Sequence, residues 1–401
     1  MIDTLFIIVL FELFIGGGGR LFPVGPLTLR MVLFAICLVV SAVVIYFRLR
    51  RLDGQRLAFG LILLYLLIHV FGLLVGVVKA NDELSEMLTE FQQSLYWLAA
   101  PFYALVLQSP AMVYKTSVVV RAAGLFLGLA YFVVLAMLGI GRLSILQILP
   151  LLHDSGEVLV RGDNFLFYKG FLYLGIGIVF FVAMRGKYWK TCSGLLIVAL
   201  ILTLTRGFVL SVSVAVLLML FAQKRRALAG FALIVVAVAA FAVFIYIPSL
   251  NQKFSEGRSA SNSTRQLDFY AIVDTTTTES LLLGEGYGAA VNDRQAIENS
   301  LLWAIWKLGI VGLAFWTLPM GLCTYYYLRI PNRTNHPIAA AFFYSMILVY
   351  VQTLTNPYLN NPIGLSFVMV AIFSLRTLAK ETRSQQVPSV DSRSRNASLL
   401  T

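Results

Sequence analysis

Charged residues are scarce in this chain. Asp, Glu, Lys and Arg make up only 12% of its 401 residues, while 59% are hydrophobic. A water-soluble domain carries about 25% charged and about 45–50% apolar residues, so this composition excludes a soluble enzyme. Most of the chain is therefore expected to lie in lipid.

Cysteine and histidine are also scarce, with three of each and no Cys/His cluster. The cysteines are too scattered for a disulfide framework, and a zinc site needs ligands at short, regular spacings. We therefore expect no metal and no cofactor. The chain also lacks a Walker motif for ATP and the acidic pair of enzymes that use nucleotide-sugars, which favours a lipid-activated sugar donor.

Acidic residues number 19 against 31 Lys and Arg, which gives a net charge of +12. In a membrane protein such an excess marks the cytoplasmic loops, and most of the basic residues here fall in the loops of one side and in the C-terminal tail. The charge therefore indicates orientation, with both termini in the cytoplasm, and no nucleic-acid partner is expected.

Long apolar runs fill most of the chain, and about 20 apolar residues are needed to cross a bilayer. One run, 194–222, is too long for a single crossing, because one helix at 1.5 Å per residue would measure about 43 Å. Basic residues flank it on both sides, and a hairpin turning near Thr203–Gly207 keeps both flanks inside. The other predicted spans are 2–16, 31–47, 57–78, 92–108, 117–140, 165–184, 227–247, 300–328, 338–354 and 363–378.

The sequence thus predicts an all-α polytopic membrane protein with about 12 transmembrane helices. Residues 1–378 form the membrane domain, and residues 379–401 form a disordered basic cytoplasmic tail. One large loop, 248–299, lies on the outer side. Loops of this length in a compact architecture are commonly functional, and its mixture of polar and aromatic residues favours an ordered lid.

Arg206 lies near the middle of the run 194–222, and Arg265 lies in the outer loop. An ionisable residue at membrane depth costs about 2.5 kcal/mol or more, so Arg206 either snorkels to the outer headgroups or binds an anion there. Arg265 alone would be an ordinary solvated residue. Two arginines that converge at a membrane surface suit a diphosphate, because a guanidinium binds phosphate oxygens in bidentate fashion.

Glu298 and Asn299 directly precede an apolar run. The carboxylate either acts as a general base for a sugar hydroxyl, with Asn299 orienting it, or only favours the N-terminus of a helix. Lys307, one to two turns further on, is either the partner of Glu298 or a snorkelling cation.

Arg161, Tyr168 and Lys169 cluster at the outer end of another span. They either line a sugar site or anchor that span at the membrane interface. The segment Gly284-Glu-Gly-Tyr-Gly288 follows no strand of a βαβ unit, so it predicts a turn and not a nucleotide-binding loop.

Three of these stretches resemble the O-antigen ligase and Wzy-type polymerase superfamily. Thr205-Arg206-Gly207 resembles the Ser-Arg-Gly turn of that superfamily, and Arg265 with the glycine-rich segment 284–288 resembles its Arg and Gly-x-Gly pair. Glu298-Asn299-Ser-Leu-Leu, followed by Gly309-Ile-Val-Gly312, resembles its His-Asn-x-x-Leu and glycine-rich helix. The resemblance covers about 190–330, while the N-terminal half is similar only in its pattern of spans.

The resemblance implies a GT-C-like glycosyltransferase of the bacterial inner membrane, with a periplasmic active site and a glycan on undecaprenyl diphosphate as donor. It also implies membrane lipid, a flippase and a chain-length regulator as partners. The paired arginines that hold the diphosphate in the family correspond to Arg206 and Arg265. The family His that activates the acceptor corresponds to Glu298, a departure that favours polymerases over ligases.

The predicted function is therefore polymerisation of lipid-linked repeat units into O-antigen or exopolysaccharide. Arg206, Arg265 and Glu298 are the expected catalytic residues, and Asn299, Arg161, Tyr168 and Lys169 the further substrate-binding ones. Two alternatives stay open. One is ligation of the finished glycan to a lipid A core or to a protein, and the other is a flippase or transporter, for which internal repeats would be expected.

Overall fold

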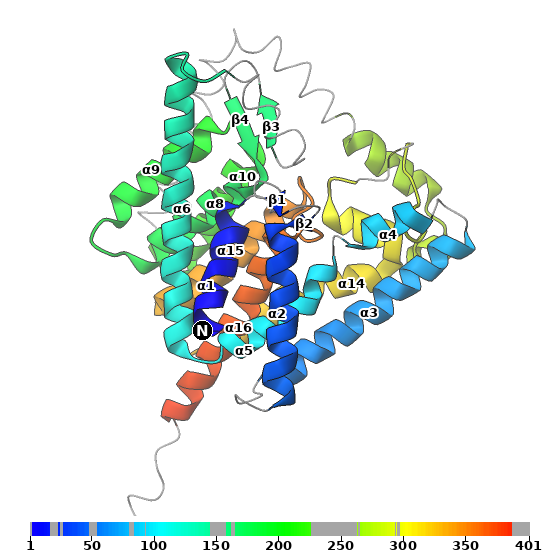
Figure 1. The fold of residues 1–401 in the computed structure, drawn as a ribbon, viewed down its shortest axis with the longest axis horizontal. Helices are drawn as coiled ribbons and strands as arrows, with labels where there is room; N and C mark the ends of the chain where they lie inside the picture. The colour runs from blue at the N-terminus through cyan, green and yellow to red at the C-terminus, as the bar shows by residue number, and fades with distance from the viewer. Residues whose placement is uncertain are drawn as a thin grey trace, which may run out of the picture.

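The computed structural model is mainly helical (Figure 1). It describes residues 2–16, 23–24, 27–47, 54–79, 84–92, 94–144, 158–161, 165–225, 263, 265–292, 294 and 297–386. The predicted span 227–247, the first part of the predicted outer loop and residues 387–401 of the predicted tail lie outside these ranges.

The helices follow the apolar runs of the sequence. The first half of the chain forms α1 (Ile2–Ile15), α2 (Leu29–Tyr46), α3 (Gln55–Val78), α4 (Leu84–Gln92), η1 (Leu95–Ala99), α5 (Ala100–Val106) and α6 (Pro110–Gly139). The second half forms η2 (Lys169–Phe171), α8 (Leu172–Met184), α9 (Trp189–Leu202), α10 (Arg206–Ala222), α13 (Thr278–Leu283), α14 (Ser300–Leu328), η3 (Arg333–Asn335), α15 (Pro337–Thr353) and α16 (Pro362–Gln386). A further helical segment covers residues 265–275.

Several of these helices are long and apolar enough to cross a membrane. Within the described ranges there are five such helices, α2, α3, α6, α14 and residues Pro362–Thr382 of α16, accompanied by shorter apolar helices. The chain is therefore a multi-pass membrane protein, and the number of twelve crossings stays a prediction. Helix α16 continues to Gln386, so it enters the segment 379–401 for which the sequence predicts disorder.

The interior of the bundle is built on α8 and α16. Every residue of α8 from Leu172 to Ala183 is buried, because α6, α9, α10 and α15 all pack against it. Helix α16 is buried along most of its span and packs on α14 and α15. Helices that are apolar on all sides, as these are, belong in the interior and not at a lipid or water surface.

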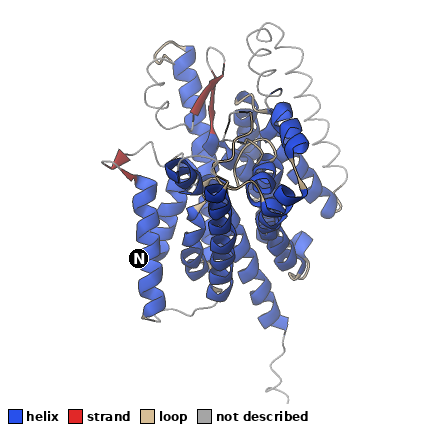
Figure 2. Ribbon diagram, turned by 90° about the vertical axis from the view of Figure 1, so that its right-hand side faces the viewer, coloured by secondary structure: helices blue, strands red, loops and turns tan. Residues whose placement is uncertain are grey.

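The helical structure is consistent with the predicted all-α membrane fold, although two short antiparallel hairpins lie between the helices in the described part of the chain (Figure 2). One pairs β1 (Pro23–Val24) with β2 (Leu27–Thr28), and the other pairs β3 (Val158–Arg161) with β4 (Phe165–Tyr168). The predicted span 165–184 therefore begins only at η2 and α8. Its first four residues, Phe-Leu-Phe-Tyr, are aromatic and apolar, and such short runs suit a strand as well as a helix.

The long apolar run 194–222 is broken where the sequence predicts a turn. Helix α9 ends at Leu202, Leu204 adopts a left-handed φ of 53°, and α10 begins at Arg206. The hydroxyl of Thr203 donates to the carbonyl of Leu200 at 2.7 Å, and the hydroxyl of Thr205 donates to the carbonyl of Thr203 at 3.1 Å. These bonds satisfy carbonyls that the break removes from the helical ladder.

Helix α14 is also broken, at Gly309, whose φ of 66° and ψ of −164° are accessible only to glycine. The glycine-rich segment 284–288 fills the break. The amide of Glu285 donates to the carbonyl of Trp306 at 2.7 Å, and the amide of Gly286 donates to that of Lys307 at 3.0 Å. The two carbonyls that lose their helical partners are thus paired, which backbone at membrane depth requires.

We expect Gly309→Ala to destabilise the protein. A Cβ at this position would clash with the carbonyl oxygen of Leu282, and this backbone conformation alone costs a side chain about 1–3 kcal/mol. Gly321→Ala in the same helix is the matched control, because nothing lies within 4 Å of its Cβ position. Thermal unfolding of the purified variants should show a lower Tm for Gly309→Ala alone, and equal Tm values would contradict the role of the break.

Candidate functional site

Two of the three predicted catalytic residues form an ion pair. Nε of Arg265 donates to Oε2 of Glu298 at 2.6 Å, although the two residues lie 33 positions apart. A terminal nitrogen of the same guanidinium donates to the carbonyl oxygen of Thr355 at 3.1 Å. Both charged side chains are about one-third exposed, at 36% and 34%, so a ligand can still reach them.

Arg206 is the first residue of α10 and its side chain is exposed. The next residue, Gly207, packs directly on the end of α15, since a Cβ there would lie 2.8 Å from Oγ1 of Thr355. The main chain beside Arg206 thus lies near the residue that binds Arg265, and within the described ranges the Arg206 guanidinium makes no ion pair.

A buried amide that the sequence analysis missed connects these elements. Oε1 of Gln352 accepts from the hydroxyl of Ser211 in α10 at 3.1 Å, and Nε2 donates to Oγ1 of Thr355 at 3.2 Å. Gln352 is fully buried near the end of α15. An uncompensated amide is costly in an apolar interior, so its position within an apolar run was the signal that could have identified it.

Asn299 is the N-cap residue of α14. Its Oδ1 accepts from the amides of Leu301 and Leu302 at 3.0 and 3.1 Å. Residues of this type stabilise a helix N-terminus by about 1 kcal/mol, so the cap fixes where α14 begins and hence where the preceding Glu298 lies. A contact of Asn299 with substrate stays a prediction.

The remaining predicted residues lie beside the start of α10. Phe167 of β4 stacks on Phe208 at 5.8 Å between ring centroids, but the hydroxyl of Tyr168 donates to the main chain of Ile15. The carbonyl of Lys169 accepts from the hydroxyl of Tyr358 at 3.0 Å. These contacts hold the β3–β4 hairpin against the helices. The side chain of Arg161 lies outside the described residues, so its role is untested.

Lys307 belongs to a second charged cluster. Its ammonium is completely buried and lies 3.0 Å from Oε2 of Glu90 in α4, so Glu298 is not its partner. Glu90 also accepts from the indole nitrogen of Trp303 at 2.7 Å and from the amide of Gly288 at 3.1 Å. One carboxylate thus ties α4 to α14 and to the glycine-rich segment, and we refer to these four residues as the Glu90 cluster.

The candidate site of Arg206, Arg265 and Glu298 combines two guanidinium groups with one carboxylate, and the bonds to Glu298 and Thr355 hold the Arg265 guanidinium in place. Guanidinium groups bind phosphate oxygens in pairs of hydrogen bonds, and a carboxylate can accept a proton from a hydroxyl. Among the described residues, no group of three His, Cys, Asp or Glu side chains is placed to hold a metal ion. Two guanidinium groups beside a carboxylate suit group transfer from a phosphorylated donor.

The chain is similar over nearly its whole length to a known protein. The O-antigen polymerase of Shigella flexneri is 28% identical over 380 residues, and the match covers 92% of this chain and 94% of that protein. No protein-family model matches the chain. Because the match extends through the N-terminal half, it confirms the resemblance that the sequence showed only for residues 190–330.

The Glu90 cluster generates a prediction about stability. Glu90→Leu leaves the Lys307 ammonium buried without its carboxylate, and breaking a buried pair in this way costs about 3–5 kcal/mol. The double variant Glu90→Leu/Lys307→Met removes both charges and should recover much of that loss. Unfolding midpoints in detergent provide the measurement. A double variant that is less stable than Glu90→Leu would contradict the pairing.

Proposed function

We propose that the chain is an O-antigen polymerase that joins oligosaccharide repeat units carried on undecaprenyl diphosphate. The observation that carries the proposal is the match over 92% of the chain, which includes the residues of the ion pair between Arg265 and Glu298. The reaction takes place at the periplasmic face of the bacterial inner membrane, in a GT-C-like domain of about twelve transmembrane helices with both termini in the cytoplasm.

The two arginines bind the diphosphate of the donor. When the bond from the anomeric carbon to the diphosphate oxygen breaks, negative charge develops on that oxygen. Guanidinium groups held in place before the reaction stabilise such charge without reorganising. Thr355 supports this role, because it binds the Arg265 guanidinium and packs against the glycine that follows Arg206.

Glu298 accepts the proton of the acceptor hydroxyl. As that hydroxyl oxygen attacks the anomeric carbon, a new glycosidic bond forms, the diphosphate leaves as an anion and the proton passes to the carboxylate. In the substrate-free protein the carboxylate is held by Arg265. Phosphate oxygens that bind Arg265 displace it, so donor binding releases the base.

This reaction requires partner proteins that supply the substrate and limit the product. A flippase supplies the lipid-linked repeat unit to the periplasmic face, and a chain-length regulator limits the product. The helical residues 265–275 and α13 fall within the large periplasmic loop of this proposal, and α13 packs against α14, so this part of the loop acts as an ordered lid.

Complementation of a strain that lacks the gene tests the proposal. Without the protein, lipid A should carry single repeat units, and the wild-type chain should restore a ladder of long chains. Arg206→Ala and Arg265→Ala should accumulate in the membrane but leave single units, since each removes half of the diphosphate clamp. Electrophoresis of the extracted lipopolysaccharide is the measurement.

Arg142→Ala is the matched control, because this exposed arginine follows the end of α6 and is not part of the proposed clamp, so its loss should leave the ladder intact. A lipid A core that is bare in the absence of the protein would contradict polymerisation and support ligation. Wild-type chain lengths in either clamp variant would contradict the clamp.

A further inference from the structure

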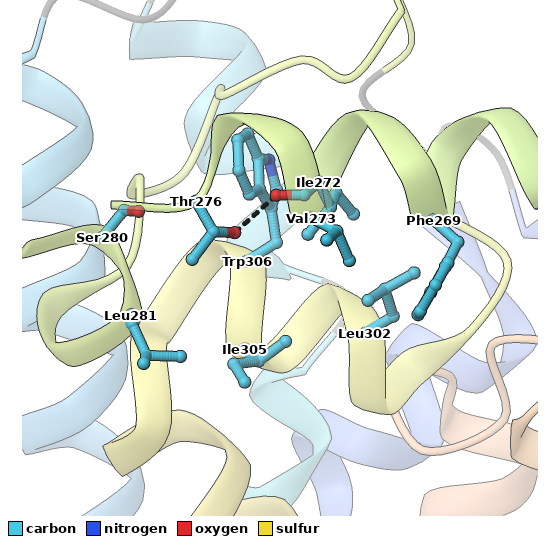
Figure 3. Close-up of a pocket in the computed structure, with 9 residues that line it drawn as sticks. All are labelled: Phe269, Ile272, Val273, Thr276, Ser280, Leu281, Leu302, Ile305 and Trp306. Atoms are coloured by element: carbon cyan, nitrogen blue, oxygen red, sulfur yellow. Dashed lines mark hydrogen bonds between the residues drawn. The ribbon is translucent and has the colours of Figure 1, made fainter. Parts of the chain in front are cut away.

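A pocket of about 340 Å³ lies between the helical residues 265–275, α13 and the first turns of α14 (Figure 3). Its wall is mostly aliphatic and aromatic. The lining residues are Phe269, Ile272, Val273, Thr276, Ser280, Leu281, Leu302, Ile305 and Trp306. The volume is typical of a small-molecule site.

The few polar atoms of the wall are not arranged for a sugar. The hydroxyl of Thr276 donates to the carbonyl of Ile272 (Figure 3). The hydroxyl of Ser280 donates to the carbonyl of Thr277, so both hydroxyls are already used. The indole nitrogen of Trp306 has no hydrogen-bond partner among the described residues, but one such donor cannot satisfy the hydroxyls of a sugar ring. Burying unpaired hydroxyls is costly, so the wall selects an apolar ligand.

The pocket begins one helical turn from the ion pair. Phe269 follows Arg265 by four residues, and residues at this spacing lie on the same face of a helix. On the opposite wall, Leu302 donates its amide to Asn299, the residue directly after Glu298. The guanidinium of Arg265 therefore stands at one end of an apolar trough.

The mouth of the pocket is apolar as well. The side chains of Phe269 and Val273 line the pocket and are still 51% and 54% exposed. Exposed apolar groups that adjoin one another mark a surface covered by lipid or by a ligand. A cation beside an apolar trough matches a molecule with an anionic head and a hydrocarbon tail.

We propose that this pocket binds the isoprene units nearest the diphosphate of the lipid-linked substrate, while Arg265 binds the diphosphate itself. The inference rests on the proposed function and adds where the undecaprenyl chain of the donor binds. A pocket of about 340 Å³ holds only the first part of an undecaprenyl chain. The remainder of the chain lies in the bilayer.

Binding of two probes to the purified protein tests the proposal. Val273→Trp and Ile305→Trp each fill the pocket from a different wall. Both variants should bind undecaprenyl diphosphate about tenfold more weakly or worse, which corresponds to about 1.4 kcal/mol. Both should bind inorganic diphosphate within about twofold of the wild type, because the arginines are untouched. Preserved diphosphate binding also shows that the variant is folded.

Leu267→Trp and Leu282→Trp are matched controls. These leucines lie in residues 265–275 and in α13, which both border the pocket, and are 60% and 53% exposed. Neither lines the pocket, so both variants should bind undecaprenyl diphosphate like the wild type. If Val273→Trp and Ile305→Trp bind undecaprenyl diphosphate normally, the inference is overturned. The proposed function still stands in that case, provided that the wild-type chain restores the ladder. A wild type that makes no ladder and binds neither probe would overturn both.

Discussion

The ion pair between Arg265 and Glu298 joins the three parts of the chain on which the site depends. It links the helical residues 265–275 to the start of α14, and the bond of the same guanidinium to Thr355 adds the end of α15. Partly exposed ion pairs contribute only about 0–1 kcal/mol to stability. The pair therefore serves mainly to position these parts, and its weakness fits our proposal that a diphosphate replaces the carboxylate.

The rigidity around this pair comes from elsewhere. The Glu90 cluster is buried, and it fixes the glycine-rich segment against the broken helix α14. Gln352 does the same between α10 and α15. The weak ion pair between Arg265 and Glu298 is thus surrounded by stronger interactions of the Glu90 cluster and Gln352. This combination suits a site that binds and releases a charged ligand while the surrounding helices keep their positions.

Much of the fold could be predicted from the sequence, because apolar runs of sufficient length specify membrane helices. The turn before Arg206 could be predicted as well, from the excess length of its run and the basic flanks. The strand β4 could not be predicted, because the hydrophobic periodicity of such a short run does not distinguish a strand from a helix. The break at Gly309 was also missed, because it depends on a segment that packs against α14 from outside.

The site could be predicted only in part. Arg206, Arg265 and Glu298 stood out as candidate charges, and the structure pairs Arg265 with Glu298. For Lys307 the sequence left open a pair with Glu298 or a snorkelling cation, and both were wrong. Its partner Glu90 lies 217 residues away, and pairing over such a separation is set by tertiary packing. Asn299 and Tyr168 form capping and main-chain bonds that a single sequence does not distinguish from contacts with substrate.

The exchange at Arg265 is the central claim, and Glu298→Gln tests it most directly. The amide keeps the size of the side chain but releases the guanidinium and cannot take the proton. We predict that undecaprenyl diphosphate binds as tightly as to the wild type or more tightly, while the rate of polymerisation in a purified system falls about 10²–10⁴-fold. Weaker binding of the diphosphate with an unchanged rate would contradict the account.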